Sequence, residues 1–146
     1  MVLLARDIMD PKVITVDGEM LVRDCAQYLS GQHRGYAVVL GPRGEVEGIV
    51  TEWDFLSKVT AGGGDPTALR VREIATPILR SCGPETPAED LVETMASEGI
   101  RRMLVRSGPQ IVGIVTSRDV LVMFRQYIDK LSSQIAGYRS DPPPLG

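Results

Sequence analysis

The chain has 146 residues, of which 43% are hydrophobic and 24% charged, and this composition excludes both a disordered polar chain and a membrane protein. Sixteen Lys and Arg against 19 Asp and Glu give a net charge of −3, which disfavours nucleic acid as the main partner. A single His and two separated Cys cannot assemble a zinc site, and no hydrolytic triad is visible. We therefore expect a cytoplasmic protein that is not an enzyme and has no catalytic cofactor.

The first unit of the chain, residues 5–60, has the pattern β-α-β-β-α. Residues 13–16 are a short apolar run typical of a strand, and residues 22–29 carry apolar side chains at helical spacing. Two further apolar runs, 36–40 and 46–50, flank a Gly-containing turn and predict a hairpin. A second helix is expected to follow this hairpin.

The second unit, residues 71–131, repeats the first after a Gly-rich connector at 61–70. Gly48 and Gly113 stand 65 positions apart, and the surrounding Gly-Ile-Val-Thr is the same in both units. The strand and hairpin of the first unit are matched by residues 78–82, 103–106 and 111–115. A unit of about 55 residues is near the lower limit for independent stability. We therefore predict an α/β (α+β) fold in which two β-α-β-β-α repeats pack sheet to sheet with pseudo-two-fold symmetry and leave two clefts between them.

Helix ends are also predicted from the sequence. Thr86 is expected to be the N-cap of the first long helix of the second repeat, with Pro87 in the first turn and Glu89 as a capping glutamate. The Pro-rich tail at 136–146 is expected to be flexible and not helical.

The sharpest motif is Gly-h-h-Thr-x-x-Asp, where h is apolar, found at Gly48–Asp54 and again at Gly113–Asp119. It places a hydroxyl at the end of a strand and a carboxylate one turn into the next helix. The free N–H groups there attract an anion such as phosphate, and the carboxylate can accept two ribose hydroxyls. The same Thr-x-x-Asp spacing also forms a capping box that needs no ligand. The residues alone leave both interpretations open.

With these motifs, residues 5–125 resemble the tandem CBS (cystathionine-β-synthase) domain family, whose paired unit is called a Bateman module. The motifs that carry the resemblance are the duplicated Gly-h-h-Thr-x-x-Asp, Asp7-Ile8-Met9 with Pro11, Arg72-Glu73-Ile74 with Pro77, and Gly99-Ile100-Arg101-Arg102-Met103-Leu104-Val105. The resemblance implies a sensor of adenosine nucleotides, or in some members a binder of S-adenosylmethionine.

The resemblance also implies which residues line the two clefts. The cleft expected to bind phosphate better contains Thr51, Asp54, Ile78, Leu79, Arg101 and Arg102. The weaker cleft contains Val13, Tyr36, Ala37, Thr116 and Asp119. The ranking rests on the Arg pair, because guanidinium groups can donate paired hydrogen bonds to phosphate.

Several of these residues have plainer interpretations. The Arg pair could be a solvated pair at a strand edge, and His33 is expected to be a surface or helix-end residue rather than a metal ligand. Trp53 is expected at an interface or in the core rather than under a base.

Residues 120–124 are five consecutive apolar residues at the start of the last helix, so this helix must be covered on two sides. The resemblance implies a homodimer formed by helices. The residues expected in that interface include Trp53, Phe55, Val120, Met123 and Phe124.

The leading hypothesis is a stand-alone regulatory module that binds AMP, ADP or ATP and signals to a partner protein. The alternatives are a ligand-free dimerisation or scaffold adaptor, an S-adenosylmethionine binder and a nucleic-acid binder.

Overall fold

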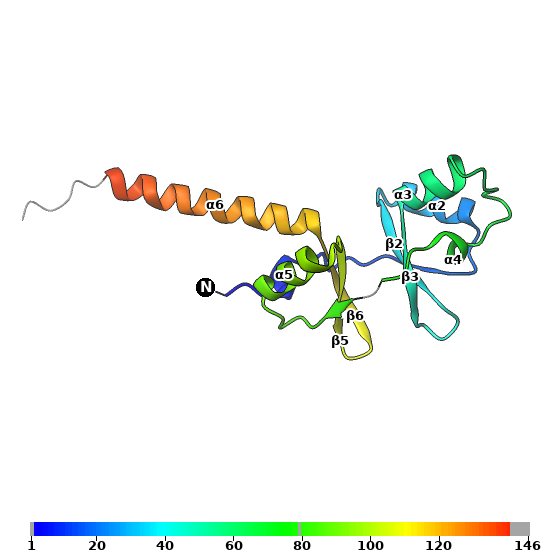
Figure 1. The fold of residues 1–146 in the computed structure, drawn as a ribbon, viewed down its shortest axis with the longest axis horizontal. Coiled ribbons are helices and arrows are strands. Elements are labelled where there is room, and N and C mark those ends of the chain that lie inside the picture. The colour runs from blue at the N-terminus through cyan, green and yellow to red at the C-terminus, as the bar shows by residue number, and fades with distance from the viewer. Residues whose placement is uncertain (1, 79, 141–146) are drawn as a thin grey trace, which may run out of the picture.

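The computed structural model describes residues 2–78 and 80–140 and contains two three-stranded sheets, one in each repeat (Figure 1). In each sheet the first strand is parallel to the second, and the second is antiparallel to the third. The strands are β1 (Thr15–Asp17), β2 (Tyr36–Leu40) and β3 (Val46–Thr51), and β4 (Ser81–Cys82), β5 (Arg102–Ser107) and β6 (Gln110–Thr116). The predicted hairpins and the duplicated α/β architecture are confirmed.

One long amphipathic helix in each repeat covers its sheet. The first, α2 (Val22–Gly31), buries Val22, Cys25 and Leu29, as its spacing predicts, and the second is α5 (Ala88–Glu98). The remaining helices are α1 (Ala5–Ile8), α3 (Glu52–Asp54), the π-helix η1 (Phe55–Thr60), α4 (Val71–Ile74) and α6 (Ser117–Ser140). Over the described ranges, none of them combines the length and the hydropathy that a bilayer crossing requires.

The prediction that Thr86 caps α5 is wrong. Pro87 is the N-cap residue, and the Thr86 hydroxyl instead accepts the Gly83 N–H at 3.2 Å. The first N–H of the helix, that of Ala88, is satisfied by the carbonyl of Leu3 at 2.8 Å. A segment distant in sequence therefore replaces the local side-chain cap.

Two other predicted boundaries differ from the structure. The opening strands are shorter than predicted, because Val13 and Ile78 pack between the two sheets instead of joining β1 and β4. The prediction that the tail cannot form a helix is wrong for residues 136–140, since α6 continues through Ser140 and a single Gly costs a helix only about 1 kcal/mol. Residues 141–146 lie outside the described residues.

Each repeat is completed by a short helix from the start of the other. The α1 residue Ala5 lies in the core of the second repeat, and its N–H donates to Thr86 O at 2.7 Å. In the same way, Val71 of α4 lies in the core of the first repeat and donates to Met20 O at 2.8 Å. This exchange ties the two repeats into one body.

The two sheets pack face to face through a shared apolar cluster. Its buried members are Val38, Ile49, Leu104 and Ile114, so both hairpins contribute equally. The chain segments that enter each repeat cross this interface, where Thr76 pairs with Ile49 and Asp10 pairs with Ile114. Thr76 and Asp10 stand 66 positions apart and are therefore equivalent in the duplication. The predicted sheet-to-sheet packing is confirmed.

The glycine of each Gly-h-h-Thr-x-x-Asp motif lies where a crossing segment touches its strand. A Cβ atom on Gly48 would meet the backbone carbonyl oxygen of Thr76 at 2.5 Å, whereas one on Gly113 would meet the flexible side chain of Met9. We expect Gly48→Ala to lower the free energy of unfolding by about 1–3 kcal/mol, because backbone cannot move aside easily.

Gly113→Ala is the matched control and should cost less, since a Met side chain can change rotamer. Urea unfolding of both variants measures the difference. An equal loss of stability in the two variants would show that the Thr76 segment yields as readily as a side chain.

Candidate functional site

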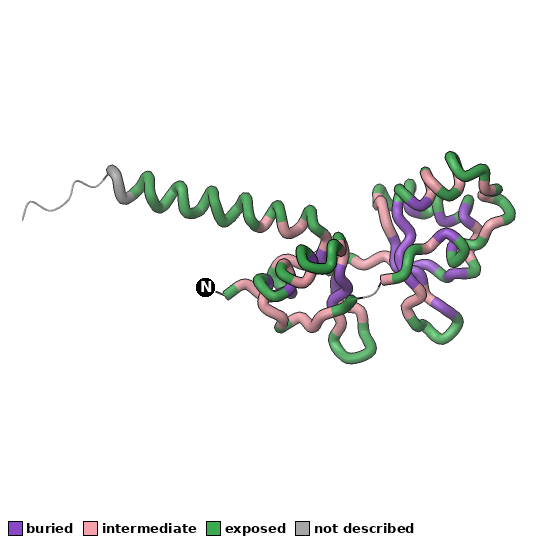
Figure 2. Tube along the Cα trace, in the orientation of Figure 1, coloured by how far each residue is buried: buried purple, intermediate pink, exposed green. Residues whose placement is uncertain are grey.

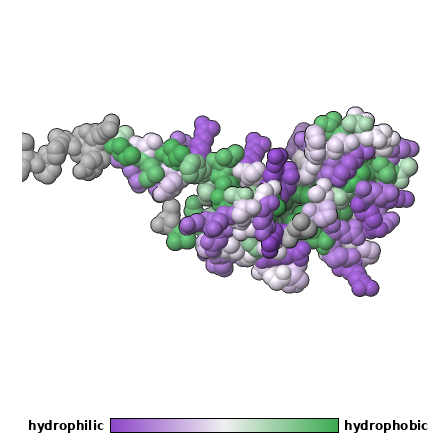
Figure 3. All heavy atoms as spheres, viewed as in Figure 1, coloured by the Kyte–Doolittle hydropathy of each residue, from purple (hydrophilic) through white to green (hydrophobic). Residues whose placement is uncertain are grey.

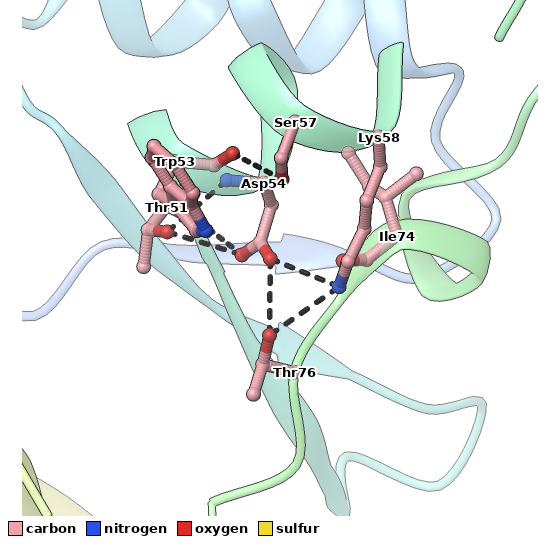
Figure 4. A network of polar contacts seen from close by, with 7 residues as sticks. All are labelled: Thr51, Trp53, Asp54, Ser57, Lys58, Ile74 and Thr76. Carbon is pink, nitrogen blue, oxygen red and sulfur yellow. Dashed lines mark hydrogen bonds and ion pairs between the residues drawn. The ribbon is translucent and has the colours of Figure 1, made fainter. Parts of the chain in front are cut away.

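Thr51 and Asp54 form a hydrogen-bonded capping box where β3 passes into α3 (Figure 4). Asp54 Oδ2 accepts the Thr51 backbone N–H at 2.9 Å and the Thr51 hydroxyl at 3.1 Å, and the Asp54 N–H donates to Thr51 Oγ1 at 3.4 Å. Such a box satisfies donors at a helix start without any ligand. The capping interpretation of the motif is therefore realised, and it uses only one of the two carboxylate oxygens.

The other carboxylate oxygen of Asp54 contacts two residues that were not among the predicted site residues. Asp54 Oδ1 accepts the Thr76 hydroxyl at 3.0 Å and lies 3.0 Å from Lys58 Nζ, which also donates to Ile74 O at 2.8 Å. A carboxylate offers about four lone-pair sites, so these contacts use it fully. Asp54 is only 2% exposed. A ligand hydroxyl therefore reaches Asp54 only by displacing Thr76 or Lys58.

The equivalent carboxylate in the second repeat is more open. Asp119 Oδ2 accepts the Thr116 N–H at 2.8 Å and the Thr116 hydroxyl at 2.9 Å, which repeats the capping box. Its Oδ1 has no partner in the part of the chain that the structure describes, and the position equivalent to Lys58 is Met123. Asp119 is half-buried and lines a hollow of about 360 Å³ between α1 and α6.

Asp54 lies beside a cavity of about 470 Å³ between the two repeats. Its lining comes from both repeats and consists of Gly35, Tyr36, Ile49, Thr51, Glu52, Trp53, Asp54, Thr76, Arg101 and Arg102. The carboxylate of one repeat and the Arg pair of the other therefore share one hollow, as the resemblance implies.

A second hollow of about 510 Å³ adjoins the first and is strongly basic. Its lining consists of His33, Arg34, Gly35, Tyr36, Glu52, Arg101, Arg102, Thr116, Ser117 and Arg118. The two hollows share five of these residues, so we refer to them together as the inter-repeat groove. Four Arg residues and one acidic residue, Glu52, line the second hollow. One of the four, Arg34, is paired with Asp10, and the remaining excess of positive charge favours an anion.

Arg102 and Tyr36 meet at the centre of the groove. Arg102 Cζ lies 5.8 Å from the centroid of the Tyr36 ring. Arg102 pairs with Thr116 on the neighbouring strand as Tyr36 pairs with Thr51, so the two residues are equivalents in the duplication. The Nε atom of Arg102 is buried and has no hydrogen-bond partner among the described residues. A buried donor without an acceptor is unfavourable, and an anion in the groove could supply the acceptor.

Asp119 lines neither hollow of the groove, contrary to the prediction that it shares a cleft with Tyr36, but Thr116, its hydrogen-bond partner, lines the second hollow. A second ion pair lies on this side of the groove. Arg34 Nη1 lies 2.9 Å from Asp10 Oδ2. Burial raises the pKa of Asp10, but the Lys12 backbone N–H and the Arg34 guanidinium outweigh it and hold the pKa below its usual value. Burial and the charge of Asp10 raise the pKa of Tyr36. Asp10 therefore adds a negative charge where the Asp54 side has the neutral Thr76.

The structure brings together only part of the predicted site. Thr51, Asp54, Arg101 and Arg102 share the 470 Å³ cavity, and Tyr36 and Thr116 line the 510 Å³ hollow. The predicted residues that pack in the apolar cores instead are Val13, Ala37 and Ile78. Leu79 lies outside the described residues.

Trp53 and His33, which were not predicted as ligand-binding residues, also line the groove. Trp53 is exposed and lines the cavity beside Asp54, so it does not lie in the core, and its expected place at an interface stays a prediction. His33 is exposed at the end of α2, as predicted, and also borders the basic hollow. The i,i+4 spacing of Asp54 and Lys58 is a sequence signal for their ion pair. Thr76 has no such signal, because its contact with Asp54 depends on where the crossing segment lies in space.

The residues expected at a homodimer interface are only partly available for one. Trp53 and Phe124 are exposed, whereas Val120 and Met123 are half-buried. Phe55 packs against the core of the first repeat, so its side chain already has an internal partner.

Comparison with known proteins agrees with this architecture. The profile of the CBS domain family matches residues 5–61 and 71–125, which together make up most of the chain. The chain therefore belongs to the CBS domain family and contains the tandem pair that forms a regulatory module.

Three relatives illustrate the similarity. Hypoxic response protein 1 of Mycobacterium tuberculosis is 28% identical over 116 residues, which cover 80% of this chain and 81% of that protein. The hexameric CBS-CP12 protein from bloom-forming cyanobacteria is 35% identical, with a TM-score of 0.73 over 83% of this chain and 67% of its own. The CBS domain pair of protein MJ0100, solved with 5′-methylthioadenosine and S-adenosyl-L-methionine, shares the fold at 23% identity, with a TM-score of 0.74 over 87% of this chain and 99% of its own.

Proposed function

We propose that this protein binds an adenine nucleotide, AMP, ADP or ATP, in the inter-repeat groove and thereby changes how it meets a partner protein. The observation that carries the proposal is the single cavity lined by Asp54, Arg101 and Arg102. A carboxylate accepts hydrogen bonds from sugar hydroxyls, and guanidinium groups donate to phosphate. A nucleotide has ribose hydroxyls and a phosphate next to each other. The adenosyl ligands of the MJ0100 domain pair support the same ligand class.

The groove also offers a route from binding to signalling. Arg102 and Tyr36 come from different repeats, so a phosphate bound by Arg102 acts at the contact between the repeats. A ligand shifts a protein between two arrangements only by the difference in its affinity for them. We propose that the nucleotide favours one arrangement of the two repeats, which a partner protein then recognises.

Calorimetric titration with AMP, ADP, ATP and S-adenosylmethionine tests the proposal. We expect one nucleotide to bind the wild-type protein and Asp54→Ala to weaken that binding more than Asp119→Ala does. Because Asp54 also caps a helix, its loss should lower the free energy of unfolding by about 0.5–2 kcal/mol. A melting curve of each variant without ligand therefore separates lost binding from lost folding.

The second candidate function is a ligand-free scaffold, and the saturated contacts of Asp54 favour it. Thermal stability distinguishes the two. A nucleotide at 100 times its Kd should add about 2.7 kcal/mol if it binds only the folded state. If no nucleotide raises the melting temperature, the groove is only a structural interface between the repeats. If S-adenosylmethionine alone stabilises the protein, the groove is still a binding site, but its ligand is S-adenosylmethionine and not a nucleotide.

A further inference from the structure

The C-terminal helix α6 leaves the body of the protein after its first turns (Figures 1 and 2). Its 24 residues span about 36 Å at 1.5 Å per residue. All residues from 124 to 137 are exposed. A helical segment as short as residues 124–137 is only marginally stable in water when nothing packs against it. The projecting part of α6 therefore needs a partner that the other residues described by the structure do not supply.

A stripe of large apolar side chains runs along this helix, and Figure 3 shows hydrophobic residues gathered on its projecting part. We call this stripe the seam, and its members are Leu121, Phe124, Ile128, Leu131 and Ile135. Each is between 39% and 68% exposed. The spacing alternates between three and four residues, which is the a and d pattern of a coiled coil.

The seam lies away from the side of α6 that meets the body. The helix residues that line the hollows beside α1 and α5 include Val120, Met123 and Tyr127, and only Phe124 of the seam joins them. With 3.6 residues in each turn, the centre of the seam lies roughly 90° around the helix from the centre of Val120, Met123 and Tyr127. The body therefore does not cover the seam.

The residue types in the seam favour a particular pairing. Leu121, Ile128 and Ile135 occupy the a positions, and Phe124 and Leu131 occupy the d positions. A β-branched residue at a with Leu at d favours two parallel strands in a coiled coil. The second and third a positions and the d position between them have this combination. The pattern therefore indicates self-association rather than a general hydrophobic surface.

We propose that the seam pairs with the seam of a second copy of this chain in a parallel, two-stranded coiled coil. The five seam side chains of two copies offer on the order of 1,000 Å², which is the lower bound for a specific interface. In a parallel pair the flanking residue Tyr127 faces Ser132 of the second copy, and Val120 faces Arg125, so no like charges meet.

The seam shares Phe124 with the homodimer interface that the resemblance implies, but Trp53 and Phe55 of that interface lie on α3 and η1, outside the seam. A membrane surface is a weaker match for the seam, because the polar side of the helix mixes Arg125, Asp129 and Lys130 and is not strongly basic.

Sedimentation of the full chain at micromolar concentration tests the proposal. We expect a dimer for the wild type and at least a tenfold weaker dimer for the double variant Ile128→Glu with Leu131→Glu. The matched control places the same two charges on exposed positions outside both the seam and the hollows of the body, in Ser133→Glu with Ala136→Glu, and should remain dimeric. All four positions are exposed, so the melting temperature of the body should not move.

Disulfide trapping tests the parallel orientation. In a parallel pair, Leu131→Cys faces its own counterpart and should cross-link readily, whereas Ser133→Cys should not. Burial raises the pKa of Cys25 to about 11 and raises that of Cys82, so the native thiols react slowly.

A monomeric wild type, or a dimer that survives the two seam charges, would overturn the proposal. Sedimentation of the wild type with anionic vesicles, lost in the seam variant, would also overturn it and assign the helix to a membrane surface.

Discussion

Replacing Arg102 by alanine should weaken nucleotide binding at least tenfold and lower the free energy of unfolding by no more than about 1 kcal/mol, the scale of its contact with the Tyr36 ring. Arg102 Nε is buried without a partner among the described residues, so the folded protein loses no internal hydrogen bond of that atom. A charge-assisted hydrogen bond to phosphate contributes about 1.5–3 kcal/mol, and 1.4 kcal/mol corresponds to a factor of ten in Kd. Calorimetric titration of the wild type and the variant with the same nucleotide measures the change.

The matched control for this prediction is Arg106→Ala. Arg106 lies on the same strand, β5, but lines neither hollow of the groove. The Arg106→Ala variant should bind nucleotide as tightly as the wild type. This result would show that binding depends on the position of the Arg102 guanidinium and not on the total positive charge of the protein. A titration that finds two equal sites, both insensitive to Arg102→Ala, would contradict the assignment of phosphate to the Arg pair.

The parts of the fold that depend on local pattern could be predicted from the sequence. The spacing of Val22, Cys25, Ala26 and Leu29 identifies a helix with one buried face. Three of these residues are buried, and Ala26 is exposed. The repeated Thr-x-x-Asp identifies two helix starts, because a capping box is made by residues three positions apart. Such features need no knowledge of where the rest of the chain lies.

The parts that depend on contacts between the repeats could not be predicted. Four residues are too few to show helical periodicity, so α1 and α4 leave no pattern, and their exchange between the repeats is visible only in space. Thr76 reaches Asp54 because its segment crosses β3, and Leu3 replaces the expected side-chain cap of α5 for a similar reason. The motif of Arg72-Glu73-Ile74 with Pro77 therefore marks the segment that carries Thr76, but it does not show that this segment reaches Asp54.

These non-local contacts also make the two carboxylates unequal. Asp54 is enclosed by Lys58 and Thr76 but shares its cavity with the Arg pair, whereas Asp119 is open on one oxygen and the second repeat has Asp10 at the position equivalent to Thr76. The duplication gave both repeats the same carboxylate, and the differing positions around it decide what each can accept. Position 58 shows the difference most clearly. Lys58 forms an ion pair with Asp54, whereas the equivalent residue in the second repeat, Met123, has no charge.

We therefore expect Lys58→Met to tighten nucleotide binding at the Asp54 side by about three- to tenfold and to lower the free energy of unfolding by up to about 1 kcal/mol. In the wild type, a sugar hydroxyl competes with the Lys58 ammonium for Asp54 Oδ1. The Lys58 side chain is 43% exposed, so solvent screens its attraction to Asp54 and only a modest loss of stability follows. Titration calorimetry and urea unfolding of the variant measure the two effects.

The reverse substitution, Met123→Lys, is the matched control because it gives Asp119 the same neighbour four residues along the helix. It should leave binding at Asp54 unchanged and weaken any binding at Asp119. If Lys58→Met instead weakens binding at Asp54, the ammonium is a ligand contact rather than a competitor, and the carboxylate does not receive the sugar in the way proposed. The opposite signs expected for the two variants follow from one cause, competition between a lysine and a ligand for the second carboxylate oxygen.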